Sequence, residues 1–120
     1  MCNGKRNAAR IAAYLAGHDA IRKVNYPGLP QSSGHEIARN QMTGFGAMLS
    51  FELDDKRIEP ASFLRRLKLI RPAVSLGGVE TIICAPAETS HAKISSEERH
   101  RIGITLFLFL LTSCACYQVQ

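Results

Sequence analysis

Residues able to bind a metal or act as nucleophiles are few and widely spaced in this chain. Two of the four cysteines form a C-x-C pair, Cys114 and Cys116, while Cys2 and Cys84 stand alone. A structural zinc site needs a second ligand pair at a suitable separation, and the four histidines are too dispersed to supply one. We therefore predict no metal site, and we interpret the cysteines as free thiols of a reducing, cytoplasmic compartment.

The other groups that could do acid–base chemistry favour structural roles. Glu52 and Glu80 are too far apart in sequence to predict a pair of cooperating carboxylates. His35 lies near the start of an expected helix, where surface or capping histidines are common. No Cys or carboxylate arrangement accompanies the remaining histidines, for which we also expect structural roles: His18, His91 and His100.

Charge and length limit the possible classes of protein. A chain of 120 residues is enough for one domain, and its net charge of +5 raises the question of an acidic partner. However, the densest basic group surrounds apolar residues at helical spacing, as on the solvent-exposed face of an amphipathic helix. That group is Arg65, Arg66, Lys68 and Arg71. Aromatic stacking platforms are absent from it, so we expect no nucleic-acid partner.

Helical and strand patterns alternate along the chain, and turn residues separate them. Apolar residues recur at helical spacing from Ala8 to Leu15, before Gly17. A short strand is expected at 23–26, and Leu49, Phe51 and Leu53 alternate with other residues as in a half-buried strand. We expect Met42 and Met48, on either side of the Gly-Phe-Gly break at 44–46, to pack in the core.

Three further helices have recognisable starts. Ser33 with Glu36, and Ser95 with Glu98, have the spacing of capping boxes and predict helices at 33–42 and from 95 to Gly103. Pro60 begins a helix that ends before Pro72 and turns Phe63, Leu64 and Leu67 inward. With a strand expected at 81–84, the pattern predicts an α/β fold: a small, mainly antiparallel sheet with helices on one side.

Five collinear segments resemble those of a known family. They read VNYPGL at 24–29, HEIARNQMTGFGAMLSFEL at 35–53, AVSLGGVET at 73–81, TSHA at 89–92, and EER with GIT at 97–99 and 103–105. In this order they resemble the cystathionine γ-synthase (transsulfuration) family of pyridoxal-phosphate enzymes. The resemblance covers residues 1–105 and implies the C-terminal domain of a fold-type-I enzyme.

The resemblance implies a function and a few site residues. Family members make or break C–S bonds of amino acids such as cystathionine, and their small C-terminal domain closes over the cofactor and helps hold the substrate carboxylate. Ser75 matches a serine of the carboxylate pocket, and Ser90 matches a Thr/Ser position near it. Val74 matches a position that differs between subfamilies. Its apolar side chain resembles methionine γ-lyases, whereas the Gly78-Val79-Glu80 that follows resembles the cystathionine enzymes, so the subfamily stays open.

Two family features are missing from this sequence. The S-x-T-K segment, whose lysine carries pyridoxal phosphate, has no counterpart among the five lysines: Lys5, Lys23, Lys56, Lys68 and Lys93. The family strand with the carboxylate-binding arginine, L-[IV]-R-[IL]-S-V-G, is replaced after Thr105 by an apolar stretch. We therefore predict that this chain alone is inactive and binds no cofactor, and that a large domain holds the pyridoxal phosphate.

The stretch 106–120 admits several interpretations. It is shorter than the roughly 18–20 apolar residues of a membrane-spanning helix, so no membrane partner is expected. Residues 106–111 could replace the missing strand, but the interpretation that we favour is an unrelated apolar tail produced by a break in the reading frame.

Two classes of function remain open from the sequence. The first is part of an enzyme that acts on amino-acid substrates and forms a homo-oligomer, as its family does. The second is a non-catalytic product: either a gene remnant without function, or an interaction module with an apolar or membrane-associated tail.

Overall fold

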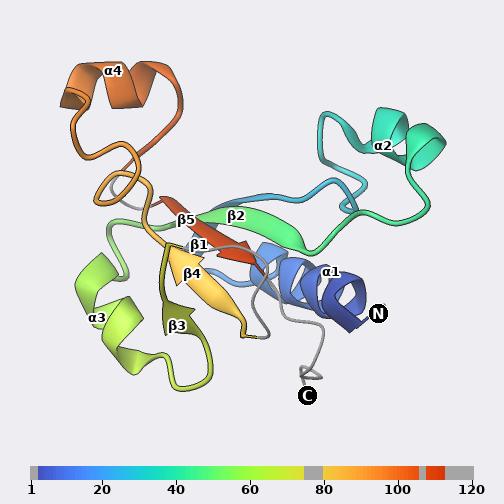
Figure 1. Ribbon diagram of the computed structural model, residues 1–120, viewed down its shortest axis with the longest axis horizontal. Coiled ribbons are helices and arrows are strands. Elements are labelled where there is room, and N and C mark those ends of the chain that lie inside the picture. The colour runs from blue at the N-terminus through green and yellow to red at the C-terminus, as the bar shows by residue number, and fades with distance from the viewer. Residues whose placement is uncertain (1–2, 75–79, 106–107, 113–120) are drawn as a thin grey trace.

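The computed structural model of the protein describes residues 3–74, 80–105 and 108–112. They contain one five-stranded sheet in the order β1-β2-β5-β4-β3 (Figure 1). The strands are β1 (Ile21–Asn25), β2 (Met48–Leu53), β3 (Arg71–Pro72), β4 (Ile82–Cys84) and β5 (Leu108–Thr112). Neighbouring strands are antiparallel except β3 and β4, which are parallel. The predicted α/β class with a mainly antiparallel sheet is confirmed.

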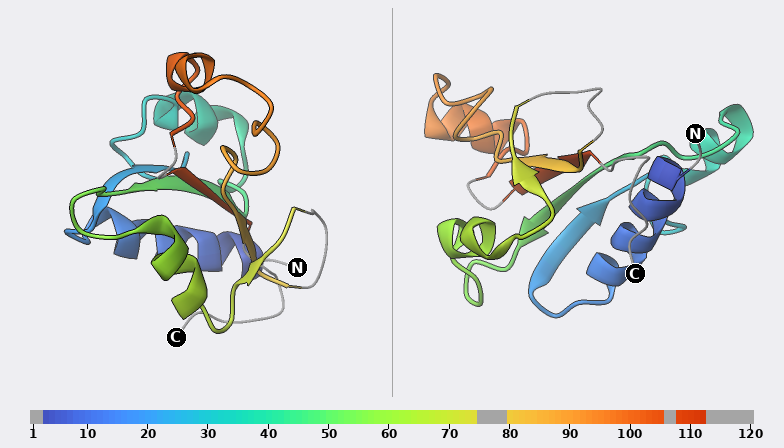
Figure 2. Two further views of the ribbon diagram at one scale, coloured as in Figure 1. Left: turned by 90° about the vertical axis from the view of Figure 1, so that its left-hand side faces the viewer. Right: turned by 60° about the horizontal axis from the view of Figure 1, so that its bottom comes forward.

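Two helices pack on one face of this sheet. α1 (Asn3–Ala16) buries Ala8 and Ala12 against it, and α3 (Pro60–Arg66) packs Phe63 and Leu64 on the same core. α2 (His35–Gln41) and α4 (Ser96–Arg101) contain no buried residues and lie beyond the other side of the sheet (Figure 2). The helices that cover the sheet are therefore on one side, as the sequence pattern predicted.

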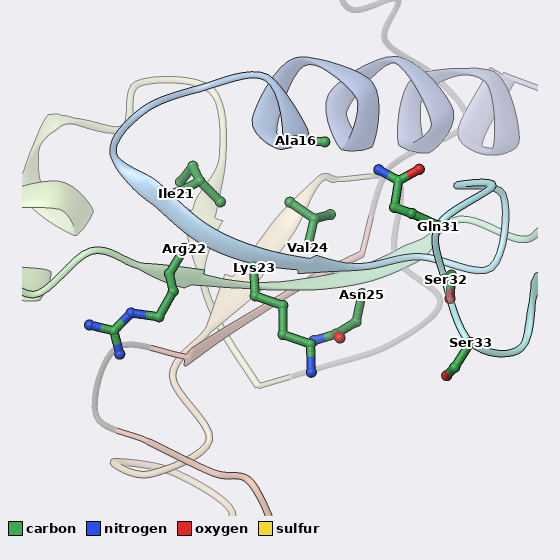
Figure 3. A pocket seen from close by; sticks show the side chains of 9 residues that line it. All are labelled: Ala16, Ile21, Arg22, Lys23, Val24, Asn25, Gln31, Ser32 and Ser33. Carbon is green, nitrogen blue, oxygen red and sulfur yellow. The ribbon is translucent and has the colours of Figure 1, made fainter.

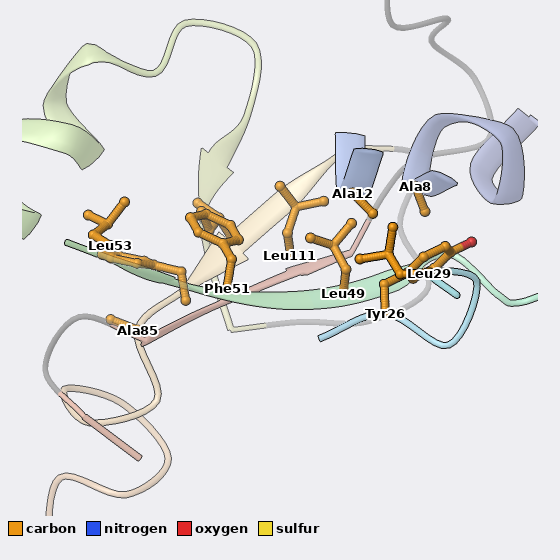
Figure 4. Close-up of a cluster of buried hydrophobic side chains, with 11 residues drawn as sticks. Ala8, Ala12, Tyr26, Leu29, Leu49, Phe51, Leu53, Ala85 and Leu111 are labelled. Carbon is orange, nitrogen blue, oxygen red and sulfur yellow. The ribbon is translucent and has the colours of Figure 1, made fainter. Parts of the chain in front are cut away.

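The core forms where three phenylalanines from separate segments meet. Phe51 of β2 and Phe109 of β5 are almost completely buried, and their ring centroids lie 5.8 Å apart. Phe63 of α3 contacts both rings, at 5.9 and 5.3 Å. Leu49 and Leu53 flank Phe51 on the same face of β2, while Leu111 lies beside them (Figure 4). The predicted alternation in β2 is thus confirmed: its odd-numbered residues are buried.

β5 corrects our interpretation of the apolar stretch after Thr105. Leu108–Thr112 lies in the middle of the sheet, hydrogen-bonded to β2 on one side and β4 on the other. Its burial alternates, with Phe109 and Leu111 in the core. An apolar tail without a place in the fold is therefore wrong for these residues, which form a central strand. Residues 106–107 and 113–120 lie outside the described part of the chain.

The helix starts give one success and one failure of the capping-box pattern. At α4, the Ser95 hydroxyl accepts a hydrogen bond from the Glu98 amide at 3.3 Å, as predicted. At α2, the N-cap is Gly34 and no side chain caps the helix, so the prediction for Ser33 was wrong. Glu36 instead pairs with Arg39 at 2.8 Å.

Two methionines also differ from expectation. Met42 is 44% exposed and Met48 is 42% exposed, so neither packs in the core as predicted. Met42 is the C-cap residue of α2, and Met48 begins β2 on the face turned away from the core. β3, only two residues long, had no recognisable sequence pattern.

The alternating burial of β5 predicts that shortening neighbouring side chains of this strand lowers the stability by different amounts. Phe109→Ala should lower the free energy of unfolding by about 3–5 kcal/mol, because it leaves a cavity between two aromatic rings. Leu110→Ala, whose side chain lies half-buried on the other face, should cost clearly less. Urea denaturation followed by circular dichroism measures both values, and equal losses would contradict the alternating burial of β5.

The two serines at helix starts provide a matched pair. Ser95→Ala should destabilise the protein by about 1 kcal/mol, because the Glu98 amide loses its acceptor. Ser33→Ala should leave stability within about 0.5 kcal/mol, since this side chain caps no helix amide. Differential scanning calorimetry of both variants tests this, and a larger loss at Ser33 would restore the capping box that the structure excludes.

Candidate functional site

Segments that carry predicted site residues leave the sheet at the same end. Val74 follows β3 and Ser90 follows β4, and these two strands are parallel neighbours. Because parallel strands end at the same edge, the segments after them begin side by side. The Ala73 amide extends the pairing by donating to the Ile83 carbonyl at 3.0 Å. This end of β3 and β4 is the candidate site.

Two of the three predicted site residues are described by the structure, and both are exposed. Val74 is 67% exposed and so is open to a ligand or a neighbouring segment. Ser90 is exposed in the loop between β4 and α4. Ser75 lies outside the described residues, and its role as a carboxylate contact stays a prediction.

The loop after β4 is folded tightly on itself. The Thr89 hydroxyl donates to the Ala85 carbonyl at 2.9 Å, and the His91 amide donates to the Pro86 carbonyl at 2.8 Å. Arg99 of α4 closes the loop, because its Nη1 donates to the carbonyls of His91 at 3.3 Å and Ile94 at 2.7 Å. Arg99 therefore ties α4 to the loop that carries Ser90.

The imidazole next to Ser90 is a further group that sequence reasoning did not assign to the site. Ser90 Oγ and His91 Nδ1 lie 2.8 Å apart, at hydrogen-bonding distance. The available signal was only their adjacency in the sequence, which does not fix where either side chain points. Together they place a hydroxyl and an imidazole at the exposed surface of the loop.

Cys84 lies at the base of this loop, on the sheet face opposite the core. It pairs with Leu110 of β5, and its side chain is half-buried. Burial raises the pKa of the Cys84 thiol, because the thiolate loses solvation, and a hydrogen bond with Thr89 acts in the opposite direction. Cys84 is a free thiol and, with its pKa raised, a weak candidate for a nucleophile.

Two of the recognised motifs interlock on the other side of the molecule. The Tyr26 hydroxyl donates to the Gly46 carbonyl at 3.0 Å, and His35 Nδ1 lies 2.7 Å from the Pro27 carbonyl. The His35 ring also stacks on Phe45, with centroids 5.3 Å apart. A side chain at Gly28 would collide with the Tyr26 ring, since its Cβ would lie 2.5 Å from Cε1. These motif residues therefore hold two loops together.

A cavity of about 420 Å³ borders the outer edge of β1, and none of the predicted site residues lines it (Figure 3). Its lining is Ala16, Ile21, Arg22, Lys23, Val24, Asn25, Gln31, Ser32 and Ser33. Pyridoxal phosphate needs a lysine together with a partner for its pyridine nitrogen. The lining contains Lys23 but neither an aromatic ring nor a carboxylate, and the Arg22 guanidinium is paired with Asp55 at 2.6 Å. This cavity does not fit the cofactor.

Two other kinds of feature are absent from the described residues: a metal site and a membrane-spanning helix. That part of the chain holds no group of three or more His, Cys, Asp or Glu side chains arranged for a metal ion. Among its helices, none has the length and apolar character needed to cross a membrane.

Solved structures define the class of protein to which this architecture belongs. The crystal structure of cystathionine γ-lyase from Lactobacillus plantarum, complexed with L-serine, superimposes with a TM-score of 0.90 and 39% sequence identity. The match covers 98% of this chain and 30% of that chain. The fold is thus that of part of a fold-type-I pyridoxal-phosphate enzyme.

Sequence comparison then identifies the family. The family model described as Cys/Met metabolism PLP-dependent enzyme matches residues 1–111, and the chain belongs to this family. The match reaches residues of β5, beyond the domain end that we predicted at 105. Cystathionine β-lyase of Lactococcus lactis subsp. cremoris is 49% identical over 98 residues, 82% of this chain and 26% of that protein. Cystathionine γ-synthase of Escherichia coli (strain K12) is 43% identical over 109 residues, 91% and 28% respectively. The chain spans about a quarter of the length of these relatives.

The environment of Cys84 predicts a pH shift in its reactivity. Half-maximal alkylation of Cys84 by iodoacetamide should need a higher pH in the folded chain than in urea, because folding disfavours the thiolate. Mass spectrometry of the peptide that contains Cys84 separates it from the other cysteines. An equal pH midpoint in the folded and unfolded chains would contradict the burial seen here.

Proposed function

We propose that this chain is the C-terminal, substrate-closing domain of a pyridoxal-phosphate enzyme that makes or breaks C–S bonds of amino acids. The observation that carries the proposal is the shared exit of the β3 and β4 segments, with Val74 on one and Ser90 on the other. Family membership and the match to a cystathionine γ-lyase structure support it. The enzyme's substrate class is therefore an amino acid of the cystathionine or methionine type.

The cofactor chemistry is assigned to a separate large domain. Pyridoxal phosphate, when bound there, withdraws electrons from the substrate's α-carbon and so makes the C–S bond labile. The cavity beside Lys23 does not fit it, because the lining lacks a free partner for the ring nitrogen. The contribution of this chain is to bind and orient the substrate carboxylate and to exclude water from one side of the site.

Carboxylate binding by this domain rests on hydroxyl groups. Ser75 and Ser90 are the donors that we assign, since a serine hydroxyl donates one hydrogen bond to an anion. β5 reads LFLLT and contributes no guanidinium, which would bind a carboxylate with two parallel hydrogen bonds. We therefore infer weak substrate binding and no activity of these 120 residues alone.

The assembly and location follow from the same assignment. We infer a homo-oligomer in the cytoplasm, in which the large domain supplies most of the contacts between subunits. The free thiol of Cys84 is consistent with a reducing compartment.

A chimeric enzyme tests the proposed function. Residues 1–120 would replace the matching quarter of Lactococcus lactis cystathionine β-lyase, and thiol release from cystathionine would be measured. We expect detectable turnover with a raised KM, and Ser75→Ala or Ser90→Ala should raise KM by a further factor of about three to ten with little change in kcat. Ser33→Ala is the control, because that exposed side chain is distant in sequence from the site.

The isolated chain supplies the complementary measurement. Incubated with pyridoxal phosphate and borohydride, it should give no stoichiometric adduct at any single lysine by mass spectrometry. A specific adduct at Lys23 would overturn the assignment of the cofactor to another domain. A folded chimera with no turnover at any substrate concentration would overturn the substrate-closing role.

A further inference from the structure

The contact between Ser90 and His91 carries an inference about how the carboxylate is bound. Ser90 Oγ lies 2.8 Å from His91 Nδ1, and within the described part of the chain this is the hydrogen bond that the Ser90 side chain makes. Ser90 is exposed and His91 is half-buried, so a ligand reaches the hydroxyl more easily than the imidazole ring.

The direction of this hydrogen bond decides what Ser90 can bind. A serine hydroxyl has one proton to donate, and a carboxylate only accepts hydrogen bonds. If Ser90 donates its proton to a bare Nδ1, it presents only lone pairs to an approaching carboxylate. If Nδ1 carries a proton and donates it to Ser90 Oγ, the hydroxyl proton is free to point at the carboxylate.

The backbone of His91 is held by contacts that do not involve Ser90. The His91 amide donates to the Pro86 carbonyl at 2.8 Å, and the His91 carbonyl accepts from Arg99 Nη1 at 3.3 Å. The same nitrogen of Arg99 donates to the Ile94 carbonyl at 2.7 Å. Both backbone groups of His91 are therefore anchored, and they hold its Cα in place beside Ser90.

We propose that His91 is a positioning residue: it donates its Nδ1 proton to Ser90 Oγ and thereby turns the Ser90 hydroxyl into a donor for the substrate carboxylate. This inference rests on the proposed function, which makes Ser90 a carboxylate contact. It adds one requirement: Nδ1 of the His91 imidazole must carry a proton. A purely structural role of His91 would not require this.

Nitrogen NMR of the intact chain measures directly whether Nδ1 of His91 carries a proton. In a sample with ¹⁵N-labelled histidine, addition of sodium acetate should shift the population of His91 toward the form protonated at Nδ1. Sodium chloride at equal ionic strength should not do so. The spectrum of His91→Asn, which lacks this imidazole, assigns the signals. Acetate bound at Ser90 while Nδ1 stays bare would overturn the proposal.

Two neutral variants of similar size test the donor itself. Asparagine carries an N–H at the same number of bonds from Cα as Nδ1, whereas leucine has no donor. His91→Asn should retain the acetate affinity within about twofold, and His91→Leu should weaken it by about three- to tenfold. The affinity is measured by titrating the backbone amide signals of residues 88–92, and circular dichroism verifies that both variants are folded.

The outcomes separate this inference from the function on which it rests. If acetate perturbs the amides of residues 88–92 in neither the unaltered chain nor the chimera, Ser90 is no carboxylate contact and the assignment fails at that residue. If acetate binds and Ser90→Ala weakens it while His91→Leu does not, the carboxylate contact stands and the positioning role of His91 is refuted. Failure of a variant to fold leaves the tautomer measurement on the unaltered chain as the deciding result.

Discussion

The sheet depends on the burial of Phe109 between Phe51 and Phe63. These rings come from β5, β2 and α3, and their centroids are 5.3–5.9 Å apart. Complete burial of one phenylalanine contributes about 1.5–3 kcal/mol, a large fraction of the stability of a domain this small. Phe109 is also the residue through which β5 is anchored to the helical layer, because its ring reaches α3 while its backbone pairs with β2.

The candidate site depends on β5, although the site lies at the end of β3 and β4. β5 connects β1 and β2, which pack on α1, to β4 and β3, which lead into the site. Leu110 is paired with Ser50 on one side and with Cys84 on the other. Without β5, the segments that begin at Val74 and Ala85 have no strand pairing to the rest of the sheet. The loop that holds Ser90 is therefore positioned by a strand that carries none of the predicted site residues.

The sequence patterns predict this fold well where burial is one-sided. α1 and β2 have one face in the core and one in water, so their apolar residues recur at the period of a helix or of a strand. β5 has the same alternation of burial as β2, but its second face carries Leu108 and Leu110 where β2 has Ser50 and Glu52, so its sequence shows no alternation. A central strand of this kind is indistinguishable by pattern from an apolar tail. The capping-box pattern was wrong at one of its two positions, for a different reason. Ser33 and Ser95 have the same spacing to a glutamate, but the turns at Leu29–Ser32 and Ser32–His35 lead the chain into α2 through Gly34.

The candidate site was predictable in its location and not in its chemistry. Motif spacing identified the segments around Val74 and Ser90, and the parallel pairing of β3 and β4 explains why two segments separated in sequence start at one end of the sheet. What spacing does not encode is the direction of a hydrogen bond. A serine beside a histidine in the sequence can be a donor or an acceptor toward a ligand, depending on which ring nitrogen of the histidine carries the proton. Here Arg99 of α4 anchors the loop by donating to the His91 carbonyl and to the Ile94 carbonyl. The loop that carries the exposed Ser90 hydroxyl is thus held by α4, a helix that contributes no buried side chain.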